Sequence, residues 1–142
     1  MISVASDAYS AFEVDYGLTT GRNGDDDGDG YTNEEEYFLG MNPMNAANLR
    51  QPRLVGNSDS PIVRYTYRRN ADEPVSYTLS RSYNLTDWEV IHSNDLTSLT
   101  YENAFLHEPA VNFSDGTSTI SIGSSVTFDS AQKQFFRIEA AY

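Results

Sequence analysis

The residues with the clearest capacity for chemistry are the carboxylates of one short acidic segment. Asp25, Asp27 and Asp29 stand at alternate positions, Gly30 follows them, and Glu36 closes a stretch of twelve residues. In that spacing the glycine permits a sharp turn, and the acids before and after it can direct their oxygens toward a single point. The segment therefore has the composition of a site for a hard cation.

The stretch from Asp25 to Glu36 matches the EF-hand loop pattern at every specified position. In such a loop Tyr31, at position seven, offers its backbone carbonyl, and Asn33, at position nine, binds directly or through water. Calcium accepts about six to eight oxygen ligands, whereas zinc or copper would need imidazole or thiolate groups, which this segment lacks. The ligands that the sequence predicts for a Ca²⁺ ion are Asp25, Asp27, Asp29, Tyr31, Asn33 and Glu36.

Two other interpretations of the same segment remain open. An acidic run can be a solvated turn that binds nothing, although random acidity would not also place Gly30 and Glu36. A shifted register would begin at Asn23 and end at Glu34. That register puts an amide at the first position and leaves Glu36 unused, so it explains fewer residues.

The loop also indicates a compartment. Extracellular calcium modules bind with dissociation constants of about 10⁻⁴ to 10⁻³ M, which calcium outside cells satisfies and cytosolic calcium does not. The chain has no cysteine, no apolar run long enough to cross a bilayer, and no signal-peptide pattern at its N-terminus. We therefore expect a module of a longer chain that is secreted or displayed at the cell surface, without membrane insertion.

The charge balance limits the partners. The chain has 142 residues, of which 21 are acidic and 9 are basic, for a net charge of −12. This excess of acid argues against nucleic acid and against anionic membrane surfaces, because both are bound largely through Lys and Arg. It also disfavours anionic polymers unless the arginines gather in one place, for which the candidates are Arg64, Arg68, Arg69 and Arg81.

The elements that position the loop are helices, and they lie before residue 50. Apolar residues between Ala8 and Leu18 recur at spacings of three and four, which predicts a short helix ended by Gly17. Thr32 is placed to cap a second helix that ends at Gly40. Residues 45–60 are rich in Asn, Ala, Pro, Gly and Ser, and they predict a connector.

Strand patterns occupy the rest of the chain. Apolar and polar residues alternate in segments that begin near Val63, Val75, Trp88, Thr119 and Gln134. The fold class predicted from this pattern is mainly β, an antiparallel β-sandwich of five to seven strands (51–142) with an N-terminal helix-loop-helix calcium-binding segment (1–50). The aromatic residues expected to build its core are Tyr65, Tyr67, Tyr77 and Trp88.

The surroundings of the loop point to a family. A Tyr-Gly-Leu phrase precedes it at residues 16–18, and an ending of the form E-Y-x-x-G-x-N-P follows it at residues 36–43. The run from Asp25 to Pro43 resembles the thrombospondin type 3 and dockerin-like calcium repeats of secreted bacterial proteins. Dockerins carry two such loops and this sequence has one, so the resemblance does not extend to cohesin docking.

The second half resembles the β-rich C-terminal extensions that follow such a repeat in large secreted bacterial enzymes and surface proteins. The matching phrases are residues 82–88 (SYNLTDW) and residues 135–138 (FFRI). This resemblance implies a place beside a catalytic domain of a parent chain. It implies no activity of the module itself.

No catalytic residue is predicted. Nucleophilic catalysis would need a histidine beside Ser or Thr and an acid, and neither His92 nor His107 lies in a recognisable motif. We expect both histidines to face solvent or to cap a strand. The sequence therefore predicts a module that is not an enzyme.

A carbohydrate-binding role is the leading hypothesis for the β half. Sandwiches of this size often present Tyr and Trp side chains to sugar rings, and Tyr83, Trp88 and Tyr101 are the candidate ligand residues, with Tyr9 as a further exposed aromatic residue. The partner would be a polysaccharide. The alternative is a purely structural, linking or cell-surface sorting domain with calcium as a staple.

Overall fold

The computed structural model describes residues 8–46, 51–57, 60–71, 73–125 and 134–142. These residues form two α-helices and eight β-strands: α1 (Ala8–Tyr16), α2 (Asn33–Phe38), β1 (Arg53–Asn57), β2 (Ser60–Arg68), β3 (Ser76–Ser82), β4 (Trp88–Asn94), β5 (Leu99–Tyr101), β6 (Ala104–Asn112), β7 (Thr117–Ser124) and β8 (Phe135–Ala141). Neither described helix is long and apolar enough to cross a membrane.

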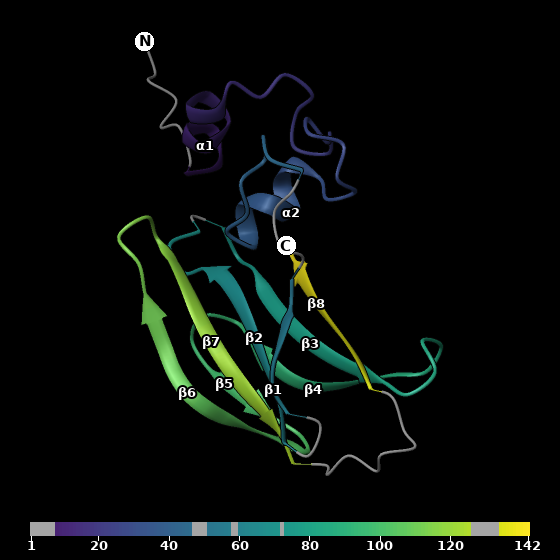
Figure 1. Cartoon of the computed structure of the whole chain (residues 1–142). Helices are drawn as coiled ribbons and strands as arrows, with labels where there is room; N and C mark the ends of the chain where they lie inside the picture. The colour runs from purple at the N-terminus through teal and green to yellow at the C-terminus, as the bar shows by residue number, and fades with distance from the viewer. Residues whose placement is uncertain (1–7, 47–50, 58–59, 72, 126–133) are drawn as a thin grey trace.

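The strands form two four-stranded antiparallel sheets, so the prediction of a mainly β protein is confirmed. Sheet A has the order β1-β2-β7-β6, and sheet B has the order β5-β4-β3-β8 (Figure 1). The predicted connector 45–60 was wrong in part, because it contains β1. Strands β5 and β6 were not predicted, since β5 has three residues and no side chain of β6 is fully buried, which leaves no alternation to detect.

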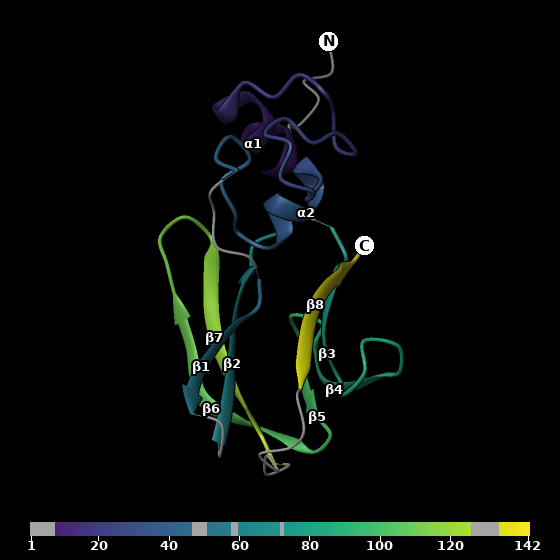
Figure 2. The same cartoon turned by 45° about the vertical axis from the view of Figure 1, so that its right-hand side comes forward.

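The two sheets face each other, and their inner side chains form the hydrophobic core (Figure 2). Tyr65 and Tyr77 have no exposed surface and Tyr67 is 8% exposed, as the alternation predicts. Trp88 was expected in this core, but it lies on the outer face of sheet B, where the Arg137 guanidinium stacks 4.3 Å from its ring. Aromatic side chains therefore build the interior, without Trp88.

A β-bulge in β4 explains the error at Trp88. Leu79 of β3 is opposite His92, and Ser80 is opposite Val90, so Ile91 is the extra residue. Both Ile91 and His92 are consequently buried, while Val90 is 48% exposed. Strict alternation along the sequence cannot reveal two consecutive inward-facing residues.

The bulge brings His92 into a buried polar network, so the expectation that His92 faces solvent or caps a strand was wrong. Its Nδ1 lies 3.0 Å from the carbonyl oxygen of Thr100, and its Nε2 lies 2.7 Å from Oη of Tyr65. The carbonyl can only accept, so Nδ1 carries the proton and Nε2 accepts from Tyr65. His107, on β6, is exposed as expected.

Both helices end as the sequence predicts. Thr32 caps α2 through a capping box in which its side chain accepts from the Glu35 N–H and the Glu35 side chain accepts from the Thr32 N–H. Gly17 after α1 and Gly40 after α2 have φ values of +63° and +67°, the left-handed conformation that closes a helix. The local signals for the two helices were therefore sufficient.

Helix α2 joins the N-terminal segment to the sheets. Tyr9 and Phe12 of α1 and Tyr37 and Phe38 of α2 belong to the same hydrophobic cluster as the tyrosines of β2 and β3. Oη of Tyr77 donates to the Phe38 carbonyl at 3.1 Å. The change of composition near residue 50 is therefore not accompanied by a break in the core.

Acid should destabilise the protein through His92. Burial lowers the pKa of His92 from 6.5 to about 4, so below pH 6.5 the unfolded chain binds a proton that the folded protein does not. Stability is lost as the pH falls from 6.5 toward 4, by about 3 kcal/mol for this group. This loss is measured by urea unfolding of the wild type and of His92→Gln at pH 7 and at pH 4.5. The free-energy difference between the two proteins should shrink at acid pH, and parallel losses would contradict this assignment.

A pair of glycine substitutions should separate backbone strain from packing. An added Cβ at Gly40 would lie 2.7 Å from Cγ2 of Thr66 and 3.1 Å from Cγ2 of Thr117, whereas at Gly17 it would meet nothing within 4 Å. Gly17→Ala should lower the free energy of unfolding by about 1 kcal/mol through strain alone. Gly40→Ala should lower it by at least about 1 kcal/mol more, because α2 must move away from sheet A. Equal effects in thermal melts would show that α2 does not press on that sheet.

Candidate metal centre

The loop between the helices gathers four carboxylates. One oxygen from each of Asp25, Asp27, Asp29 and Glu36 lies within 4.8 Å of the corresponding oxygens of the others. The three aspartates come from the loop, and Glu36 comes from α2. These four acids are the side-chain ligands with a formal charge that the sequence predicts for the cation.

Backbone N–H groups hold the aspartates in place. Asp25 accepts from the N–H groups of Gly28 (2.8 Å) and Gly30 (2.9 Å), and Asp29 accepts from the N–H of Tyr31 (2.8 Å). The Asp29 N–H also lies 3.3 Å from an oxygen of Asp27. Because each carboxylate is tied on one side to the turn, the turn itself aims the carboxylates at the centre of the loop.

Glu36 is the buried residue of the cluster. Its side chain has no exposed surface, and neither carboxylate oxygen has a hydrogen-bond partner among the described residues. Burial, together with the negative charges of Asp29, Asp27 and Asp25, raises the pKa of the Glu36 carboxyl to about 8. Oδ2 of Asp27 is likewise buried without a partner in the described structure. Buried carboxylate oxygens without donors are the arrangement that a bound cation would satisfy.

Asp26 and Asn33 have a different role from the acids around them. Asp26 accepts from the backbone and hydroxyl groups of Thr19 and Thr20, and Asn33 Nδ2 donates to it at 2.8 Å. These hydrogen bonds hold the pKa of Asp26 well below its usual value. The predicted ligand Asn33 thus uses its amide to hold the preceding segment against the loop. Asp26 was missed because position two of the pattern has no specified residue.

Glu34, which would be the last ligand in the shifted register, takes part in another interaction. The Glu34 carboxylate accepts from Nε of Arg22 at 2.7 Å, and the same guanidinium pairs with Glu73. Its Cζ also lies 4.4 Å from the ring centre of Tyr9. Arg22 therefore ties both helices to the turn before β3, and the carboxylate that ends the shifted register is already paired.

Two of the three candidate ligand aromatics, Tyr83 and Trp88, flank the turn between β3 and β4, and the third, Tyr101, lies on β5. Trp88 is on the outer face of sheet B, and Tyr83 is exposed in the turn after β3. Tyr101 lies on the edge strand β5, where its ring stacks 5.1 Å from that of His92. Tyr9, the further candidate, is 4% exposed and packs in the core, so it was wrong as an exposed residue. The structure does not bring these side chains into one row.

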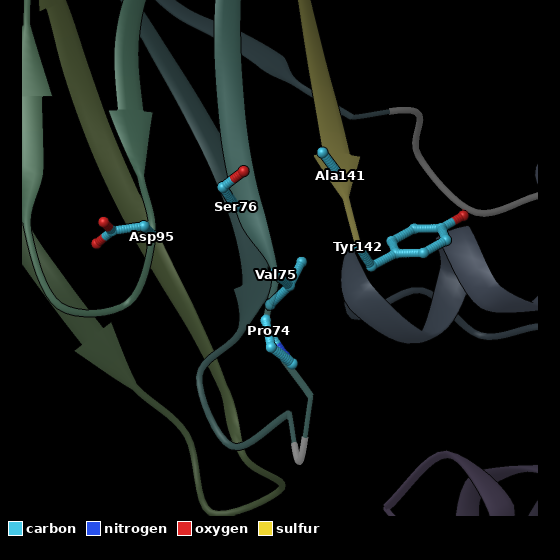
Figure 3. Close-up of a pocket in the computed structure, with 6 residues that line it drawn as sticks. All are labelled: Pro74, Val75, Ser76, Asp95, Ala141 and Tyr142. Atoms are coloured by element: carbon cyan, nitrogen blue, oxygen red, sulfur yellow. The ribbon is translucent and has the colours of Figure 1, made fainter.

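A hollow near the C-terminus offers little chemistry. It has a volume of about 470 Å³ and is lined by Pro74, Val75, Ser76, Asp95, Ala141 and Tyr142 (Figure 3). The Asp95 carboxylate accepts from Thr97 and Ser98 of its own turn, which lowers its pKa to about 2. The Tyr142 ring reaches toward α2 and stacks on Phe38 at 4.7 Å. The only side-chain carboxylate among the residues that line the hollow, that of Asp95, is thus already hydrogen-bonded within its own turn.

Comparisons of the chain with protein-family models and with curated proteins found no match. The relation to thrombospondin type 3 and dockerin-like repeats therefore stays a prediction from the sequence, and the chemistry of the site has to be argued from its own residues.

Proposed function

We propose that this chain is a calcium-stabilised, non-catalytic accessory module of a larger secreted bacterial protein. In this proposal the N-terminal helix-loop-helix is the calcium-binding segment, and it braces an antiparallel β-sandwich. The observation that carries the proposal is Glu36, whose two buried oxygens lack a partner in the described structure and face three aspartates.

The donor set favours calcium among the common cations. All four gathered groups are carboxylates, and no histidine belongs to the cluster. Hard oxygen ligands suit Ca²⁺ and Mg²⁺, but Mg²⁺ keeps several waters and seldom uses a site built wholly from protein groups. Asp25, Asp27, Asp29 and Glu36 would hold the ion, and its charge would replace their mutual repulsion with attraction.

The position of Glu36 makes the ion a staple for the whole chain. Tyr37 and Phe38 follow it directly on α2 and are buried in the aromatic core. Nε of Arg68, on β2, donates to the Tyr37 carbonyl at 2.9 Å. Calcium bound at Glu36 would therefore stabilise the packing of α2 on the sheets as well as the loop itself.

Carbohydrate binding is the proposed task of the β half. Exposed Tyr83 and Tyr101 and partly exposed Trp88 support it, because aromatic rings offer apolar faces to sugars. A non-catalytic role fits the state of His92, whose two ring nitrogens already contact Tyr65 and Thr100. The competing proposal, a structural or cell-surface sorting domain, is favoured by the continuous core that joins loop and sheets.

Calcium should stabilise the β half against unfolding. Trp88, the single tryptophan of the chain, lies on β4, so its fluorescence reports the unfolding of that half. At a free calcium concentration one hundred times the dissociation constant, binding adds about 2.7 kcal/mol, which is a rise of roughly 8 °C in melting temperature. Thermal unfolding followed by Trp88 fluorescence in EDTA and in calcium measures this. An unchanged Trp88 transition, with no bound ion by elemental analysis, would refute the calcium proposal.

Adjacent glutamates provide the matched controls. Glu36→Gln should abolish the calcium-dependent rise, because it removes the charge of the buried ligand. Glu35→Gln should keep it, because Gln can accept the capping hydrogen bond from Thr32 that Glu35 accepts at 3.0 Å. Equal responses of the two variants would show that the ion does not bind at Glu36.

The glycan proposal is tested by migration in native gels that contain different polysaccharides. A binding module should be retarded by at least one polysaccharide of a broad panel that includes neutral and acidic chains, while bovine serum albumin runs unchanged. Unchanged migration on every gel would refute carbohydrate binding and leave the structural role.

A further inference from the structure

The outer face of sheet A carries a groove whose chemistry differs from the rest of this acidic protein. Its volume is about 370 Å³, within the range of small-molecule sites. Residues from all four strands of the sheet and from the turn after β6 line it: Arg53, Arg64, Glu108, Pro109, Val111, Phe113, Thr119 and Ser121. Arg64 lies between the buried Val63 and Tyr65 of β2, so it leaves the face of sheet A that points away from the core.

Two arginines stand directly opposite each other in this groove. Arg53 of β1 and Arg64 of β2 are partners in the strand register, so their side chains leave the same face of the sheet. Like charges in that position destabilise a sheet. In a chain with 9 basic residues against 21 acidic ones, an anion bound between or beside them would offset this repulsion.

Few of the described groups pair with the charges of these two arginines. Arg53 has no ion pair or hydrogen bond with any residue that the structure describes. Arg64 donates from Nε to Ser121 Oγ at 3.1 Å, and its Nη2 lies 3.9 Å from Glu108, which is too far for a hydrogen bond. By contrast, Arg68 and Arg69, which the sequence offered as candidates for a basic cluster, donate to backbone carbonyls.

The remaining lining groups select against a simple polyanion. Glu108 would repel a chain with a charge on every unit, and Thr119, whose Oγ1 lies 2.9 Å from Oγ1 of Thr66, adds a hydroxyl to the lining. Val111 and Phe113, which are 55% and 47% exposed, give the groove an apolar wall. Hydroxyl, carboxylate and apolar groups together are suited to a sugar ring, and the arginine pair is suited to one carboxylate.

We propose that this groove binds a uronic-acid-containing polysaccharide, with a sugar carboxylate at Arg53 and Arg64 and ring hydroxyls beside Glu108 and Thr119. The inference rests on the proposed carbohydrate-binding function and names its site and ligand class. It places the site on sheet A, away from Trp88 and Tyr101 of sheet B, and it makes the acidic group of the glycan the feature that is recognised.

The test measures binding of a neutral oligosaccharide that carries one glucuronic acid unit, and of its methyl ester, at one fixed free calcium concentration by titration calorimetry. The wild type should bind the acid at least about tenfold more tightly than the ester, because the ester lacks the charge that the arginines recognise. Raising the salt from 50 to 500 mM should reduce that preference.

Three arginine variants distinguish the groove from general charge. Arg53→Gln and Arg64→Gln should each weaken binding of the acid roughly tenfold and leave the ester unaffected. Arg137→Gln removes the same charge from the outer face of sheet B and should change neither. Without ligand, Arg53→Gln should melt at the wild-type temperature or slightly above it, because it removes a like-charged pair.

The failures are distinguishable. Equal affinity for acid and ester, or equal loss in Arg137→Gln and Arg53→Gln, would overturn the uronate site. Binding of poly-glutamate or a sulfated glycan as tightly as the oligosaccharide with one glucuronic acid would also overturn it, in favour of a general anion site. Retardation by neutral polysaccharides alone would reject this inference and keep the carbohydrate-binding function, whereas no retardation by any polysaccharide would reject both.

Discussion

Helix α2 places a carboxylate and an aromatic core side by side, and the rest of the structure depends on that arrangement. Glu36 and Phe38 have no exposed surface, and Tyr37 between them is 1% exposed. An isolated buried carboxylate costs several kcal/mol in a folded protein unless an opposite charge compensates it. In a helix of six residues the acid cannot leave its site without moving the two aromatic residues. The charge of the Glu36 carboxylate and the packing of the aromatic core therefore depend on each other.

Several arginines supply hydrogen bonds and ion pairs that connect parts of the fold. Arg22 joins Glu34 and Glu73, and Arg68 donates to the carbonyls of Tyr37 and Asp115. Arg81, 1% exposed, pairs with Glu89. These side chains act as internal donors that connect loop, helices and sheets. Arg53 and Arg64 differ from them because they meet on an outer face with little to neutralise them.

The β half has its own buried polar constraint. The β-bulge at Ile91 turns His92 inward. There it accepts a hydrogen bond from Tyr65 of the opposite sheet and donates one to the carbonyl of Thr100 on the neighbouring strand. Asn94 lies 3.4 Å from the same tyrosine hydroxyl. Since each of these groups needs a partner when buried, the network favours one register of β4 over its alternatives. Both ring nitrogens of His92 are thus occupied within this network.

The sequence by itself determined what depends on neighbours along the chain. The spacing of Asp25, Asp27 and Asp29, the Thr32 capping box and the glycines that end both helices were all predictable, because their hydrogen bonds span a few residues. The alternation of β2 likewise predicted buried Tyr65. These features are local, so composition and spacing are enough to identify them.

Burial, the β-bulge and the register between strands became clear only in the tertiary structure. It buried Glu36 against the acidic loop, and it turned His92 inward through a bulge that alternation cannot show. It also paired Arg53 with Arg64, although β1 was hidden in a connector of polar and small residues. Burial and register depend on strand pairing between distant segments, and a one-residue shift in pairing reverses the face of every side chain. The loop pattern was recognisable in the sequence, whereas the burial of the Glu36 carboxylate without a hydrogen-bond partner in the described structure was not.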